Sequence, residues 1–87
     1  MTRERLLELA TLVADALDII EEKKLPHNVE ISVGRYPEIW VHENIQKCNE
    51  NTHRFYGYRD FDGQERDTDL NLAEAYLREL IGRMKNE

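Results

Sequence analysis

The sequence contains one cysteine and no long apolar run, and each of these absences excludes a class of protein. Cys48 has no second cysteine with which to form an intramolecular disulfide, so we expect a reducing compartment such as the cytoplasm. No apolar run approaches the ~18 residues that a membrane-spanning helix needs. The charged N-terminal stretch does not fit a signal peptide. We therefore expect a cytoplasmic protein with no membrane partner.

Basic residues are also scarce. The 12 Lys and Arg residues are outnumbered by 18 Asp and Glu residues, which gives a formal net charge of −6. A protein that binds nucleic acid through the phosphates needs a basic surface. We therefore expect no direct contact with nucleic acid.

Motifs that carry catalysis are absent as well. The sequence has no motif of a Ser/His/Asp catalytic triad, no P-loop and no glycine-rich dinucleotide-binding motif. His42, Cys48 and His53 are candidate metal ligands, but their spacing matches no compact zinc motif. Ligands on opposite faces of a strand also would not converge. We expect no enzymatic activity, no cofactor and no metal.

The residues that are present suit one small globular domain. A chain of 87 residues, 40% apolar and 34% charged, can bury one core, so we expect a single domain over residues 1–87. Apolar residues at helical spacing predict a helix over 2–24, with Thr2 as its N-cap and Pro26 beyond its end. Its predicted core face consists of Leu6, Leu9, Ala10, Val13, Ala16, Leu17 and Ile20.

The same periodicity predicts a second helix over about 70–85. Its apolar positions are Leu70, Ala73, Leu77, Leu80, Ile81 and Met84. Asn71 and Glu74 fit a capping box, with Thr68 or Asp69 as alternative caps. The pairs Glu74–Arg78 and Glu79–Arg83 have the favourable i,i+4 order.

Between the helices, alternating apolar and polar residues predict three strands, over 29–34, 39–44 and 53–61. Short connections between strands favour antiparallel pairing. The sequence therefore predicts an α+β fold with the order α-β-β-β-α, in which both helices pack on one face of a three-stranded antiparallel sheet.

The strands also predict an aromatic surface. If Val29, Ile31, Val33, Ile39, Val41, Phe55 and Phe61 face the helices, then Trp40, His42, Tyr56 and Tyr58 share the open face. Cross-strand aromatic pairing explains such a face. A dimer or partner surface and nucleotide stacking are the alternatives, and a one-residue slip in register would exchange the two faces.

The excess negative charge is confined to two segments. Residues 1–24 carry four positive and six negative charges, residues 60–69 carry one and five, and the rest of the chain is neutral. In the first helix, carboxylates fall within about 40° of one line opposite the predicted core face. Their positions are Glu4, Glu8, Asp15, Asp18 and Glu22.

Two interpretations of this stripe remain open. One is a solvated helix face, and the other is a negative strip presented to a basic partner. Leu12 and Ile19 lie about 60–80° from the stripe. They are hard to place in the core, which favours an apolar docking site beside the carboxylates.

The second acidic segment, 60–69, does not fit a calcium-binding EF-hand. Counted from Asp60, the sixth position is Glu65 where glycine is required, and the twelfth is Asn71 where a bidentate glutamate is required. Turn chemistry followed by acidic residues at a helix start explains the composition. Asp60, Asp62, Glu65 and Asp67 are candidate contact residues, and they join the acidic stripe of the first helix only if the two segments adjoin in the fold.

The element order α-β-β-β-α is similar to that of double-stranded RNA-binding domains. Those domains carry a basic cluster at the start of the second helix, where this sequence has Leu70-Asn71-Leu72-Ala73-Glu74, so RNA binding does not follow from the resemblance. The size, acidity and element order also resemble those of some phage-encoded inhibitors of CRISPR nucleases. This second resemblance implies a protein that occupies a nucleic-acid channel.

Together these observations predict a non-enzymatic acidic interaction protein. The most specific hypothesis is a phage or mobile-element inhibitor that masks a basic, nucleic-acid-binding site on a partner such as a CRISPR nuclease. The alternatives are a small structural module that dimerises through the open aromatic face or a strand edge, and a nucleotide or other small-ligand binder. The expected acidic contact residues are Glu8, Asp15, Asp18, Glu22, Asp60, Asp62, Glu65 and Asp67. The expected apolar and aromatic contact residues are Leu12, Ile19, Trp40, Tyr56 and Tyr58.

Overall fold

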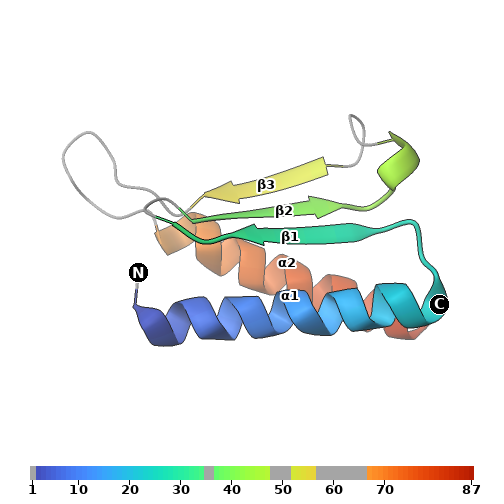
Figure 1. Ribbon diagram of the computed structural model, residues 1–87, viewed down its shortest axis with the longest axis horizontal. Coiled ribbons are helices and arrows are strands. Elements are labelled where there is room, and N and C mark those ends of the chain that lie inside the picture. The colour runs from blue at the N-terminus through green and yellow to red at the C-terminus, as the bar shows by residue number, and fades with distance from the viewer. Residues whose placement is uncertain (1, 35–36, 48–51, 57–66) are drawn as a thin grey trace.

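A computed structural model describes residues 2–34, 37–47, 52–56 and 67–87 (Figure 1). Its elements are helix α1 (Arg3–Lys23), strands β1 (Asn28–Ser32) and β2 (Glu38–His42), the 3-10 turn η1 (Ile45–Lys47), strand β3 (Thr52–Tyr56) and helix α2 (Asp67–Lys85). The strands form one antiparallel sheet in the order β1-β2-β3. The predicted α+β fold is confirmed.

Helix α1 begins and ends close to where the sequence predicts. The Thr2 hydroxyl accepts the backbone N–H of Arg5 at 3.1 Å, as expected of an N-cap. At the other end Lys24 adopts a left-handed conformation with φ of 54°, and its N–H bonds to the Ile20 carbonyl. This closes the last turn before Pro26.

The first two strands end earlier than predicted. β1 ends at Ser32, so Val33 lies beyond the strand and is 62% exposed. The expectation that Val33 faces the helices is therefore wrong. β2 ends at His42 rather than Asn44, and the part of the third predicted strand beyond Tyr56 lies outside the described residues.

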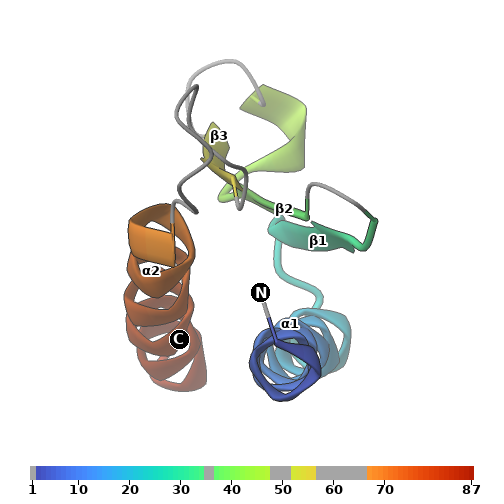
Figure 2. The ribbon, with the colours of Figure 1, turned by 90° about the vertical axis from the view of Figure 1, so that its left-hand side faces the viewer.

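The two helices run in the same direction beneath one face of the sheet (Figures 1 and 2). α1 packs against β1 and α2 against β3, and the helices pack against each other. Ties at both ends keep them parallel: Arg5 bonds to Asn71 and Glu74, and the Lys23 ammonium bonds to the carbonyls of Met84 and Lys85 at 2.7 and 2.8 Å. The core between these layers consists of Leu9, Leu12, Val13, Ala16, Val29, Ile39, Val41, Leu70, Ala73, Leu77, Leu80 and Met84.

The buried face of α1 differs from the predicted one. Leu12 is only 8% exposed and belongs to the core, and Ile19 packs against that core, whereas Leu17 is 37% exposed. The expectation that Leu12 and Ile19 stand outside the core is wrong. Because α1 contacts α2 on one side as well as β1 above it, its buried face turns about 50° toward Leu12.

Helix α2 begins three residues earlier than predicted, at Asp67. Asn71 and Glu74 therefore lie inside the helix and do not form a capping box; Thr68 and Asp69 are helical as well. Instead, the side chains of Asn71 and Glu74 hold Arg5 of α1. The two predicted i,i+4 ion pairs are present, Glu74–Arg78 at 3.5 Å and Glu79–Arg83 at 3.9 Å.

Candidate functional site

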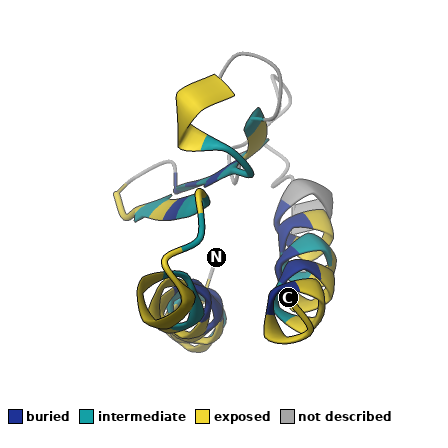
Figure 3. Ribbon diagram, turned by 90° about the vertical axis from the view of Figure 1, so that its right-hand side faces the viewer, coloured by how far each residue is buried: buried dark blue, intermediate teal, exposed yellow. Residues whose placement is uncertain are grey.

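The acidic stripe predicted on α1 forms a continuous exposed surface in the fold. We call this surface the acidic face; it consists of Glu4, Glu8, Asp15, Asp18 and Glu22, all of them exposed. Figure 3 shows the buried side of α1 turned toward the sheet and α2, with its outer side exposed. On the helical wheel the acidic face is centred about 130° from the centre of the buried residues.

Most of this charge is not neutralised by the part of the chain that the structure describes. Glu8 pairs with Arg5 at 3.3 Å, but Arg5 also bonds to Glu74 and Asn71. No cation among the described residues forms an ion pair with Asp15, Asp18 or Glu22. The carboxylates at the middle and C-terminal end of α1 are therefore available to a basic group from outside.

The five carboxylates of the acidic face are 4, 7, 3 and 4 residues apart along α1. From Glu4 to Glu22 the acidic face extends about 27 Å at 1.5 Å per residue. Five charges over this length correspond to about half the charge density of one strand of duplex DNA.

Part of the second acidic segment adjoins the described structure. Asp60, Asp62 and Glu65 lie outside the described residues, and Asp67 is the first residue of α2. Because the helices are parallel, α2 begins at the end of the molecule where α1 begins (Figure 1). The chain therefore enters α2 at the same end as Glu4 and Glu8.

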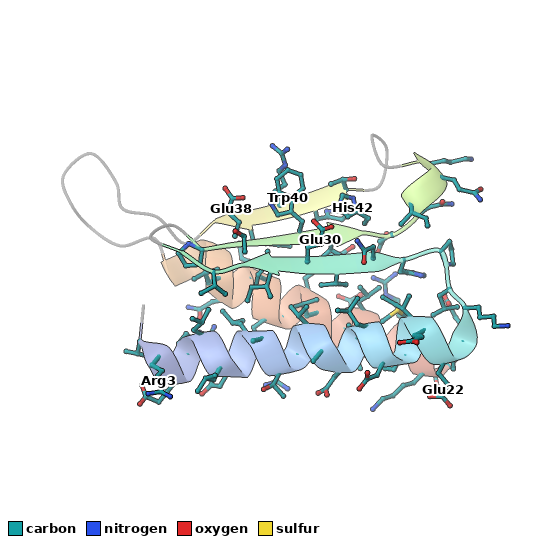
Figure 4. All side chains as sticks on the ribbon, in the orientation of Figure 1. Arg3, Glu22, Glu30, Glu38, Trp40 and His42 are labelled. Atoms are coloured by element: carbon teal, nitrogen blue, oxygen red, sulfur yellow. The ribbon has the colours of Figure 1, made fainter. Side chains whose placement is uncertain are left out.

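The open face of the sheet has different chemistry. Glu30, Glu38, Trp40 and His42 all point away from the helices (Figure 4). The Trp40 indole N–H donates to Glu38 at 3.0 Å, and the Arg54 guanidinium lies 3.7 Å from the centroid of the Trp40 ring. One side of the indole is therefore already occupied by a cation of the same chain.

The remaining aromatic positions follow the register. His42 lies opposite Thr52, and its Nδ1 is 3.1 Å from the Thr52 hydroxyl; its ring centroid is 6.2 Å from that of Trp40. Tyr56 pairs with Glu38 through the backbone, and Tyr58 lies outside the described residues. The register agrees with the alternation predicted for Trp40 and His42.

A polar cluster beneath the sheet was not predicted from the sequence. The Tyr76 hydroxyl donates to Glu43 at 2.6 Å, Arg83 donates to the same carboxylate at 3.0 Å, and the His53 ring lies 4.7 Å from the Tyr76 ring. Burial and the bond to Glu43 raise the pKa of Tyr76 to about 12, and the same hydrogen bond lowers the pKa of Glu43. The cluster ties α2 to the segment after β2, and no local sequence signal indicates it.

Of the candidate metal ligands, Cys48 lies outside the described residues, and His42 and His53 lie on opposite faces of the sheet. His42 contacts Trp40 on the open face, whereas His53 contacts Tyr76 on the helix side. Within the described ranges, no three His, Cys, Asp or Glu side chains are placed to hold a metal ion. Neither of the two described helices is long and apolar enough to cross a membrane.

The fold and its surfaces define a small α+β protein with an acidic helix face and an aromatic sheet face. Comparison with protein-family models, with curated proteins and with solved structures finds no match to this chain. Its function is therefore argued from the surfaces alone.

Proposed function

We propose that this chain is a non-enzymatic interaction protein that binds a basic partner through the acidic face of α1. The supporting observation is that Asp15, Asp18 and Glu22 are exposed, lie along one line and have no cationic partner among the described residues. Like charges at i,i+3 and i,i+4 spacing destabilise a helix by a few tenths of a kcal/mol per pair. A basic partner relieves this repulsion and gains steered, fast association.

The more specific form of the proposal is an inhibitor that masks a nucleic-acid-binding site. A rod of carboxylates about 27 Å long fits a groove lined by Lys and Arg. Its charge density is below that of DNA, and Asp67, the first residue of α2, lies at the N-terminal end of the helix pair (Figure 1). Its origin in a phage or mobile element, with a CRISPR nuclease as partner, rests only on the resemblance in size, acidity and element order.

The sheet face is less suited to the alternative functions. Arg54 already covers the Trp40 ring, and Glu38 already accepts the indole N–H. A stacking nucleotide would have to displace Arg54. A dimer formed through this face would have to bury Glu30 and Glu38 along with the indole, which costs free energy unless both carboxylates find partners.

The test compares two triple variants that remove the same charge. Asp15→Asn/Asp18→Asn/Glu22→Gln neutralises the acidic face, and Glu30→Gln/Glu79→Gln/Glu87→Gln neutralises exposed carboxylates elsewhere. Immobilised wild type is used to capture a partner, which is identified and then titrated with each variant in the presence of labelled duplex DNA.

We expect wild type and the second variant to displace DNA from the partner, and the first to bind about tenfold more weakly or worse. Affinity should also fall steeply with salt. Equal affinity of the two variants, or affinity independent of salt, would contradict the proposal.

A further inference from the structure

A third face of α1 carries an exposed apolar pattern that the buried core and the acidic face do not use. Leu7 is 56% exposed, Leu17 is 37% exposed, and Ala10 and Ala14 lie between them. Arg3 and Glu21 continue the same line at its two ends. We call this line the α1 seam: Arg3, Leu7, Ala10, Ala14, Leu17 and Glu21.

The seam has the spacing of a helix–helix contact. Its successive positions alternate between four and three residues apart, which is the a/d spacing of a two-helix seam. It is centred about 130° from the buried residues and about 100° from the acidic face. Arg5 and Lys23, which contact α2, lie about 160° from it, so the seam is on the side of α1 away from α2.

The order of residues along the seam is symmetric about its middle. When a second copy of α1 is placed antiparallel with its centre at Leu12, Arg3 meets Glu21, Leu7 meets Leu17, and Ala10 meets Ala14. Each pair then occurs twice, as a two-fold axis requires. The leucines pair with leucines, the small residues allow close approach at the centre, and the two ends carry opposite charges.

We propose that the occupant of the α1 seam is a second copy of this chain, bound through antiparallel α1–α1 packing. Charge complementarity favours a second copy over an unrelated apolar partner, because no described residue forms an ion pair with Arg3 or Glu21, and each is the other's counterpart across the axis. This interface is distinct from the sheet face and goes beyond binding of a basic partner.

The seam is about 27 Å long and one helix wide, which gives a footprint well below the ~800 Å² per partner of a standard interface. The dimer is therefore weak, with a dissociation constant in the micromolar range or above.

Dimerisation also brings the two acidic faces side by side, with Glu4 of one copy near Asp18 of the other. Because each chain carries −6, moderate salt strengthens the dimer, whereas salt weakens the complex with a basic partner.

The test measures sedimentation of the full chain from micromolar to millimolar concentration. Arg3→Glu and Glu21→Arg each place like charges together twice, so each raises the dissociation constant about tenfold, and the double swap restores it. Glu30→Arg is the control, since it makes the same charge change at an exposed position of β1, outside both the seam and the acidic face, and leaves the dimer in place. Leu7→Ser abolishes the dimer, whereas Leu72→Ser on α2, at the same 56% exposure, does not.

Cross-linking reports the direction of the helices. In a Cys48→Ser background, a mixture of Leu7→Cys and Leu17→Cys chains forms a mixed disulfide, and Leu7→Cys alone does not, because the two copies of position 7 lie about 15 Å apart along the axis. A monomer at all concentrations, no rescue by the double swap, or Leu7→Cys homodimers would each overturn the proposal. None of these results contradicts binding of a basic partner through the acidic face, because that proposal is tested separately by the triple variants.

Discussion

The hydroxyl of Tyr76 donates a 2.6 Å hydrogen bond to the Glu43 carboxylate, which joins helix α2 to the residue that follows strand β2. The two residues are 33 positions apart in the chain. Burial of the phenol and the adjacent carboxylate raise the pKa of Tyr76 to about 12. This bond is shorter than the 3.0 Å bond that Arg83 donates to the same carboxylate.

Tyr76→Phe tests the strength of that link. The substitution keeps the ring against Phe55 and His53 but removes the donor to a partly buried carboxylate. We expect a loss of about 1–3 kcal/mol in the free energy of unfolding, measured by urea denaturation. In a Glu43→Gln background the same change should cost less, and an equal cost in both backgrounds would show that the bond contributes nothing.

Acid should destabilise the fold through two carboxylates. The hydrogen bond from Tyr76 lowers the pKa of Glu43, and the bond from Arg5 lowers the pKa of Glu74, both from an ordinary value of 4.5. A lowered folded-state pKa stabilises the protein above the unfolded-state value, and this contribution is lost as the pH falls through the folded-state value.

We therefore expect Glu43 and Glu74 to leave the urea midpoint of unfolding independent of pH above pH 4.5. Below pH 4.5 the midpoint should decrease as the pH is lowered. Glu43→Gln/Glu74→Gln should start from a lower midpoint near neutral pH and show a shallower fall in acid. The same slope in the variant and in wild type would assign the acid sensitivity to other carboxylates.

Lys24 offers a site for stabilisation. It adopts φ of 54°, a left-handed conformation that costs a residue with a Cβ more than it costs glycine. Lys24→Gly should raise the free energy of unfolding by about 0.5–1 kcal/mol. The neighbouring Lys23→Gly should lower it by at least about 1 kcal/mol, because it places glycine in the helix and removes the ammonium from the last carbonyls of α2. Thermal unfolding of the two variants should shift in opposite directions.

Local patterns in the sequence predicted the elements and their order, because helix and strand periodicity depend only on neighbouring residues. What they did not predict depends on contacts between distant segments. The sequence around Asn71 and Glu74 has the spacing of a capping box, yet both side chains bind Arg5, which is 66 and 69 positions away. Likewise, the acidic face can be predicted from residue spacing along one helix. The position of Arg54 over the Trp40 ring depends on the register between β2 and β3, which local spacing does not determine.

Leu12 is the residue at which this difference is largest, and it provides the last prediction. On one helix its position beside the carboxylates suggests exposure, but it is only 8% exposed, on the side of α1 from which Arg5 and Lys23 bond to α2. Leu12→Ala should therefore cost about 2–3 kcal/mol of unfolding free energy as a core truncation. Leu72→Ala, at 56% exposure on α2, should cost less than about 0.5 kcal/mol. Urea denaturation at low protein concentration compares the two, and equal small losses would mean that Leu12 is not buried in solution.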